Sequence, residues 1–161
     1  MRERSVAVAP PRCRSCAPLA PLCREPSKSV AVATLLADTN ALVWHLVEPK
    51  RLGRAARRAL ADADAGRRLC YVPVIALVEI WLLSQKGRLR IGPAQVLDVL
   101  SDHPGYSVLS LDVEQALEFG SLAGVRDPMD RLVLAAARVT GSRLVSVDPA
   151  LEGHGVERIW D

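Results

Sequence analysis

Four carboxylates in this sequence occupy positions where burial, not solvent exposure, is expected. Asp38 and Asp148 each end a short apolar run, while Glu79 interrupts a longer apolar run and Asp130 opens another. A buried carboxylate without a partner costs several kcal/mol, so it normally takes a cation or leaves its ionised form. No lysine or arginine is regularly spaced to neutralise these four groups. The pattern therefore predicts a divalent metal ion as their common partner.

Oxygen ligands of this kind suit Mg²⁺ or Mn²⁺, which keep several waters and bridge to phosphate groups. Metal ions can activate water and stabilise the leaving oxygen of a phosphodiester, so this chemistry needs no histidine. The three histidines, His45, His103 and His154, fit no acid–base pattern and are expected to be surface or packing residues.

Each acid also has a simpler interpretation. Asp38 suits the N-cap of a helix, Asp130 is placed to pair with Arg131 or to cap its own helix, and Asp148 before Pro149 is a common turn opener. Glu79 is the strongest single indication of function, because an exposed helix face is not expected to be so apolar around it. Asp127 suits a loop cap or a supporting group better than a metal ligand.

The elements that must position these acids alternate between strands and helices, the pattern of a parallel sheet covered by helices. The predicted strands cover 34–38, 69–72, 106–111 and 143–147, with a short edge strand at 157–160. The predicted helices cover 40–47, 53–65, 73–85, 93–102, 112–122 and 129–140. The fold class is thus α/β, with a parallel sheet of four to five strands between two helical layers. Ligands of such sheets bind at the carboxyl ends of the strands, where Asp38 and Asp148 stand.

The 161 residues suit one folded domain at 33–161, preceded by a disordered extension at 1–32 that is rich in Pro, Cys and Arg. Residues 34–161 hold fifteen basic and sixteen acidic side chains, which excludes a generally basic nucleic-acid-binding surface. No apolar stretch approaches the roughly 20 residues of a membrane span, and no secretory signal is expected, so the chain reads as cytoplasmic. Zinc at Cys13, Cys16 and Cys23 is disfavoured, since no fourth ligand follows at a usual spacing.

Five stretches, taken together and in this order, resemble the PIN domain, and in particular the VapC-type toxins of bacterial type II toxin–antitoxin pairs. They are LLADTNAL at 35–42, VEI at 78–80, RDPMDR at 126–131, LVSVD at 144–148 and GVERIW at 155–160. The resemblance implies a PIN-like three-layer sandwich over 33–161 and a metal-dependent endoribonuclease. It implies that the catalytic and metal-binding acids are Asp38, Glu79, Asp130 and Asp148, supported by Thr39, Asn40, Asp127 and Ser146.

The resemblance also implies partners: an RNA substrate, a VapB-type antitoxin whose tail blocks the pocket, and a second copy of the chain in a homodimer. Trp44, Trp81 and the Arg-rich helix between Arg54 and Arg68 are candidate partner surfaces. Ser146 stands where the family usually has threonine, so the hydroxyl is retained.

Three other functions fit the sequence less well. A haloacid-dehalogenase-type phosphatase needs a second aspartate where Asn40 stands, and a receiver-type phosphoacceptor needs paired acids at strand one and a late lysine. A catalytically inactive PIN-like module that binds RNA or protein remains the alternative to an enzyme.

Overall fold

The computed structural model describes residues 33–161. The extension expected at 1–32, including Cys13, Cys16 and Cys23, lies outside the described residues, so that domain boundary stays a prediction. The helices are α1 (Thr39–Val47), α2 (Arg54–Asp64), α3 (Val74–Gln85), α4 (Pro93–Ser101), α5 (Val113–Ser121) and α6 (Pro128–Thr140), with short 3-10 helices η1 (Pro49–Arg51) and η2 (Pro149–Leu151). The strands are β1 (Leu35–Ala37), β2 (Cys70–Pro73), β3 (Tyr106–Leu109), β4 (Arg143–Val145) and β5 (Arg158–Ile159).

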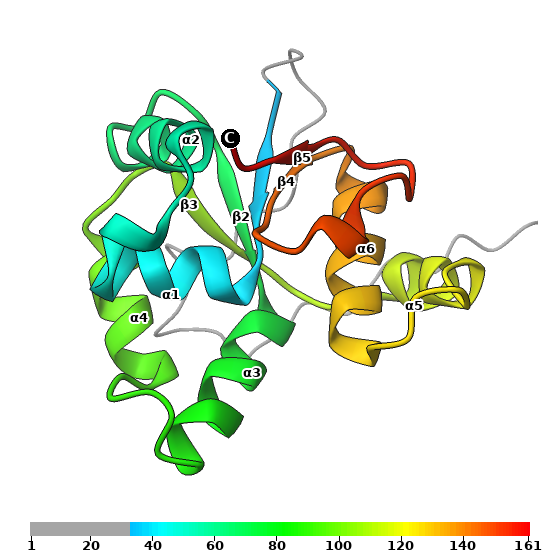
Figure 1. The fold of residues 1–161 in the computed structure, drawn as a ribbon, viewed down its shortest axis with the longest axis horizontal. Coiled ribbons are helices and arrows are strands. Elements are labelled where there is room, and N and C mark those ends of the chain that lie inside the picture. The colour runs from blue at the N-terminus through cyan, green and yellow to red at the C-terminus, as the bar shows by residue number, and fades with distance from the viewer. Residues whose placement is uncertain (1–32) are drawn as a thin grey trace, which may run out of the picture.

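The five strands form one parallel sheet in the order β3-β2-β1-β4-β5 (Figure 1). The chain adds β2 and β3 on one side of β1 and then returns to add β4 and β5 on the other. The order therefore reverses between β1 and β4, and the crevice outside such a switch point is where open α/β sheets bind ligands. Asp38 and Asp148 follow these two strands.

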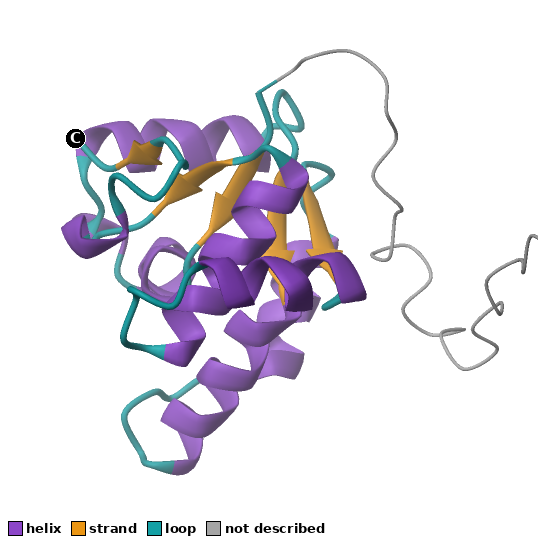
Figure 2. Ribbon diagram, turned by 90° about the vertical axis from the view of Figure 1, so that its right-hand side faces the viewer, coloured by secondary structure: helices purple, strands orange, loops and turns teal. Residues whose placement is uncertain are grey.

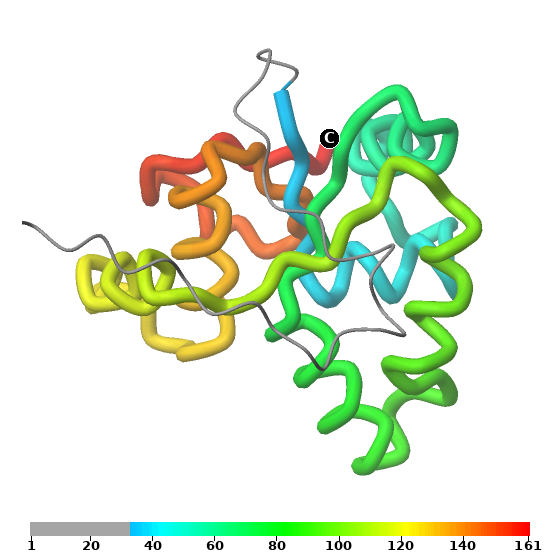
Figure 3. Tube along the Cα trace, turned by 180° about the vertical axis from the view of Figure 1, so that it is seen from behind, coloured from blue at the N-terminus to red at the C-terminus, as the bar shows by residue number. Residues whose placement is uncertain are grey.

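Alternation along the strands divides the core into two parts, because successive side chains of a strand point to opposite faces of the sheet. Leu35, Ala37 and Val72 join the core under α1, α2 and α4, whereas Leu36 and Leu144 join the core under α6. Helices α5 and α6 pack together on that second face (Figures 1 and 2). The same two helical layers are seen from behind in Figure 3. The predicted three-layer α/β architecture with a parallel sheet is confirmed.

Helix α3 begins directly where β2 ends and packs against α1, α4 and α6. Pro73, which the sequence places in the first turn of this helix, is instead the last residue of β2 and the N-cap of α3. Its fixed φ of −65° suits an extended backbone as well as a helix, so proline alone could not decide between them.

Helix α6 carries its own start and stop signals. The Asp127 carboxylate accepts a hydrogen bond from the Met129 backbone N–H at 2.7 Å, and Gly141 ends the helix in a left-handed conformation with φ of 62°. These signals fix Asp130 in the first turn. Within 33–161, none of the helices has the length and apolar composition needed to cross a membrane.

Candidate active site

The carboxyl ends of β1 and β4 bring Asp38 and Ser146 into direct contact. The two strands pair in register from Leu35 to Ala37, and the Asp38 backbone N–H extends the ladder by donating to the Val145 carbonyl at 3.0 Å. Just beyond this bond, the Ser146 hydroxyl donates to Asp38 Oδ2 at 2.8 Å. Residues 108 positions apart thus meet because two parallel strands end at one edge.

Ser146 is fully buried and joins three segments. Besides donating to Asp38, its Oγ accepts the Asp148 backbone N–H at 3.1 Å, and its carbonyl accepts Arg158 Nη1 at 3.1 Å. The Asp148 side chain caps η2 by accepting the Ala150 N–H at 2.8 Å. The turn-opening role of Asp148 is therefore real, and it holds the carboxylate at the same edge as Asp38.

Asp38 is 5% exposed, and its side chain caps no helix although the residue occupies the N-cap position of α1. Burial raises its pKa from 3.8 to about 6, against the lowering effect of the Ser146 hydrogen bond. The charges of Glu79 and Asp148 raise the pKa further. Such an acid is poorly stabilised in its ionised form by the protein alone.

Asp130 lies half-buried in the first turn of α6 and does not pair with its neighbour Arg131. The Arg131 guanidinium instead donates to the Val125 carbonyl at 2.6 and 3.1 Å and covers the Phe119 ring at 4.6 Å. The pKa of Asp130 is raised to about 6, and burial is the largest cause. The negative charge of Asp127 is the next cause, and the charges of the other three acids contribute less. The simpler ion-pair interpretation of Asp130 is thereby wrong.

Glu79 lies half-buried in the middle of α3, and its charge raises the pKa of both Asp38 and Asp130. The apolar residues on its own face of the helix are partly covered, since Ile75 and Leu83 are half-buried and Leu82 is 37% exposed. What links Glu79 to the site is its electrostatic effect on the other acids, and its role as a site residue stays a prediction.

The two supporting residues after Asp38 differ in their environments. Thr39 is 1% exposed, and its Oγ1 has no hydrogen-bond partner among residues 33–161. Asn40 is exposed. A buried hydroxyl without a partner normally costs free energy. The Thr39 hydroxyl, next to Asp38 in the chain, is therefore available to form a hydrogen bond with a bound group.

The four acids fit a hard divalent ion in their chemistry. Among residues 33–161 none of them forms an ion pair with a basic side chain. In the same range, no three Asp, Glu, His or Cys side chains stand close enough together to hold an ion by themselves. Mg²⁺ usually binds through one or two carboxylates and keeps several waters. A buried acid without a cation, coupled to three others, is compatible with that mode of binding.

Sequence reasoning missed a hollow beside Asp130, to which Arg126 and His154 contribute. The two loops that form it are 23 or more positions apart in the chain, so spacing gave no signal. The one local hint is the sequence Gly153-His154-Gly155, because two glycines around a single polar residue are typical of a sharply turning loop that presents it.

Comparison with known proteins shows which family has this sequence pattern and this fold. Residues 35–155 match the family model described as PIN domain. The chain is 31% identical over 125 residues to Ribonuclease VapC22 of Mycobacterium tuberculosis, an alignment that covers 76% of this chain and 93% of that protein. In fold it is similar to VapBC2 from Rickettsia felis bound to a DNA fragment from their promoter, with a TM-score of 0.61 at 16% identity, covering 80% of this chain and 99% of the other.

A second similar structure is Mycobacterium tuberculosis VapC20, a sarcin-ricin loop cleaving toxin, with a TM-score of 0.55 at 14% identity, covering 76% of this chain and 96% of the other. At these identities the structures support the fold, whereas the family match and the 31% identical relative support membership. The chain therefore belongs to the PIN-domain family, among the VapC-type ribonuclease toxins.

Proposed function

We propose that this chain is a Mg²⁺- or Mn²⁺-dependent endoribonuclease that acts as the toxin of a toxin–antitoxin pair. The observation that carries the proposal is Asp38, a buried carboxylate with no cationic partner in the described residues, at the switch point of the sheet. Its pKa and that of Asp130 respond to Glu79 and Asp148, so the four acids act on one another. Family membership supports ribonuclease activity, and the metal-binding role of these acids is our inference.

In this proposal Asp38, Glu79, Asp130 and Asp148 would hold the ion together, some of them through the waters that Mg²⁺ keeps. When bound, it supplies Lewis-acid polarisation of the phosphodiester and activation of water. Ser146 fixes the orientation of the Asp38 carboxylate by its hydrogen bond. The remaining supporting groups are Thr39 and Asn40, which follow Asp38, and Asp127, which fixes the start of α6.

The substrate we expect is single-stranded RNA, as in loops, because splayed bases can enter a crevice that a duplex cannot. The body of the chain is close to neutral, so attraction to RNA must come from local arginines and from the ion. A chain that cleaves RNA in this way is expected to act in the cytoplasm.

We also propose two protein partners. A VapB-type antitoxin would silence the activity, in line with the structural relatives that are toxin–antitoxin complexes. A second copy of the chain would cover the exposed apolar side chains Val78, Trp81 and Leu82 of α3. A second copy is the better occupant of this patch, because an antitoxin must leave whenever the toxin acts, and an apolar patch needs permanent cover.

The nuclease proposal is tested with the purified chain and a 5′-labelled single-stranded RNA. We expect cleavage with Mg²⁺ or Mn²⁺, none with EDTA, and a loss of at least a hundredfold in Asp38→Asn, which keeps the shape of the side chain but not its charge. Asp98→Asn is the matched control, since Asp98 is exposed on α4. If wild type and Asp38→Asn bind RNA equally and neither cleaves it, the chain is a binding module and not an enzyme.

A further inference from the structure

A hollow of about 350 Å³ adjoins Asp130 and is formed by two loops, one just before α6 and one within 150–154. The buried side chains of Val125 and Leu151 give it an apolar wall. Its volume lies at the lower end of the range of roughly 300–1,000 Å³ that ligand sites occupy. The hollow is thus of a size for one flat organic group.

Two planar nitrogen-rich side chains, Arg126 and His154, also line this hollow. Arg126 is exposed, and within residues 33–161 its guanidinium has no ion-pair partner. The Asp127 carboxylate, by contrast, already accepts the Met129 N–H. The hollow therefore offers an apolar wall, one guanidinium without an ion pair in residues 33–161 and one imidazole, beside the carboxylates of Asp127 and Asp130.

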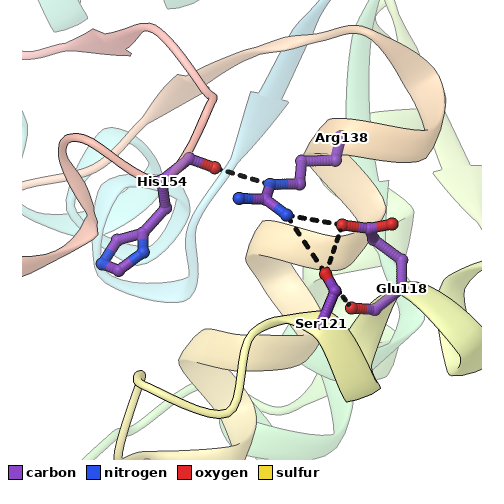
Figure 4. Close-up of polar contacts among 4 residues, drawn as sticks. All are labelled: Glu118, Ser121, Arg138 and His154. Carbon is purple, nitrogen blue, oxygen red and sulfur yellow. Dashed lines mark hydrogen bonds and ion pairs between the residues drawn. The ribbon is translucent and has the colours of Figure 1, made fainter.

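The position of His154 is set by Arg138 of α6 (Figure 4). Arg138 Nε donates to the His154 carbonyl at 2.5 Å, and Nη1 donates to Glu118 Oε1 at 2.6 Å and to Ser121 Oγ at 3.2 Å. In Figure 4 the carbonyl of His154 points toward the guanidinium and the imidazole points away from it. Arg138, a residue of α6, thus connects the backbone of the His154 loop to α5. The imidazole of His154 takes no part in these contacts.

Glycines on both sides of His154 permit this contact. Gly153 and Gly155 have φ values of 81° and 74°, which other residues adopt only with strain. A Cβ on Gly155 would lie 3.4 Å from Arg138 Nε, so the loop passes close over the guanidinium. The two glycines therefore allow the turn that brings the His154 carbonyl to Arg138, and the hydrogen bond holds the backbone there.

We propose that the hollow is a subsite for one unpaired nucleobase of the RNA, next to the phosphodiester that is cleaved. His154 and Arg126 are its recognising side chains, and Arg138 is the residue that positions His154. The proposal rests on the ribonuclease activity proposed above. Unpaired bases are typically recognised by stacking on aromatic or guanidinium planes, and His and Arg provide both planes here. A base attached to the cleaved nucleotide must lie near Asp130, which the hollow shares.

The test uses a single-stranded RNA library of random sequence, from which the ends of cleaved fragments are sequenced, and one preferred substrate for kinetics. We expect His154→Ala to raise KM roughly tenfold, with a smaller effect on kcat, and to flatten the base preference at one position beside the cut. His154→Phe, which keeps a plane that can stack, should restore most of the affinity. His103→Ala, before β3 at the opposite edge of the sheet, is the matched control.

An abasic nucleotide at the preferred position gives a second readout. Wild type should lose about tenfold in kcat/KM on this substrate, while His154→Ala should lose little more, because the missing base is the group that the side chain contacts. Equal KM and equal base preference in wild type and His154→Ala would overturn the subsite and leave the nuclease standing. No cleavage by wild type with either metal would overturn both proposals.

Arg138→Met tests the positioning role. This variant should raise KM by a factor similar to that of His154→Ala, and the double variant should be no worse than either single one. A lower melting temperature in Arg138→Met without a change in KM would show that Arg138 is structural only, and would overturn its assignment. The response of the melting temperature to Mn²⁺ should be unchanged in His154→Ala, which separates base binding from metal binding.

Discussion

At the scale of single residues, the properties of Asp38 follow from its neighbours. The carboxylate is buried, receives one hydroxyl hydrogen bond from Ser146, and faces the charges of Glu79 and Asp148. Burial and repulsion outweigh the hydrogen bond, so the folded chain holds the Asp38 proton more tightly than the unfolded chain does. The metal-free protein thus carries a stability cost that a cation at this position would relieve.

This cost predicts a pH dependence of stability. Because the pKa of Asp38 rises from 3.8 to about 6 on folding, its proton stabilises the folded state at low pH, and that stabilisation is lost as pH rises through 6. In EDTA, the free energy of unfolding of wild type relative to Asp38→Asn should fall by about 1 kcal/mol between pH 5 and pH 7.5. Urea unfolding at a series of pH values measures it. A flat or rising difference would mean that Asp38 is not a buried, repelled acid.

Glu79 predicts a second effect, because its charge repels both Asp38 and Asp130. Glu79→Gln should raise the melting temperature of the metal-free protein by about 2–5 °C. The same variant should weaken the rise in melting temperature that Mn²⁺ produces by binding the folded state. Differential scanning calorimetry with EDTA and with a Mn²⁺ series measures both.

The control for this experiment is Glu114→Gln, an exposed change on α5 that should leave the Mn²⁺ response intact. The proposed role of Glu79 would be contradicted if Glu79→Gln and wild type responded equally to Mn²⁺.

At the scale of elements, the sheet edge owes its geometry to close backbone contacts. Gly105 precedes β3, and a Cβ there would lie 2.1 Å from the Ala63 carbonyl oxygen and 2.7 Å from that of Arg68. Both are backbone atoms and cannot turn aside. Gly105→Ala should therefore lower the free energy of unfolding by about 2 kcal/mol or more.

The matched control is Gly120 in α5, where a Cβ meets nothing within 4 Å. Gly120→Ala should stabilise the chain by up to about 1 kcal/mol through helix propensity alone. Urea unfolding of the two variants should thus give opposite signs. Two changes of the same sign would contradict the packing described for β3.

The order and type of the elements could be predicted from sequence, because each apolar run is long enough to identify and is bounded by Gly, Pro or a capping residue. Their ends could not be predicted to the residue. Strand β3 ends at Leu109 and not at residue 111, and β4 ends at Val145 and not at 147. A strand ends where the neighbouring strand no longer supplies backbone hydrogen-bond partners, and the sequence of one strand does not show this. Asp112 caps α5 and Gly141 ends α6, and these local signals are why the predicted start near residue 112 and the predicted end at 140 agree with the structure.

For the candidate site, the positions of Asp38 and Asp148 at neighbouring strand ends followed from the sheet pattern. The exposure of Trp81 and Leu82 on α3 did not, because it depends on which helices cover α3. Nor did the position of His154, whose backbone carbonyl accepts a hydrogen bond from Arg138, sixteen residues earlier. Contacts between distant loops leave no periodic signal in a sequence.

At the scale of the whole molecule, the exposed apolar side chains of α3 predict self-association. Light scattering should give twice the mass of one chain, and Trp81→Glu should shift the molecule to the monomer by placing a charge in the contact. Leu117→Glu, an equally drastic change at an exposed position of α5, should keep the dimer. A dimer that survives Trp81→Glu and dissociates with Leu117→Glu would place the interface on α5 instead.

The central claim, that four distant acids act together on one divalent ion, is tested most directly by a crystal of the protein soaked in Mn²⁺ and measured at a wavelength where manganese scatters anomalously. We predict an anomalous peak at the carboxyl edge of β1 and β4, with oxygens of Asp38 and at least one of Glu79, Asp130 and Asp148 within about 2–2.5 Å of it. A crystal that gave no peak at this edge, while Mn²⁺ bound elsewhere or not at all, would contradict the claim.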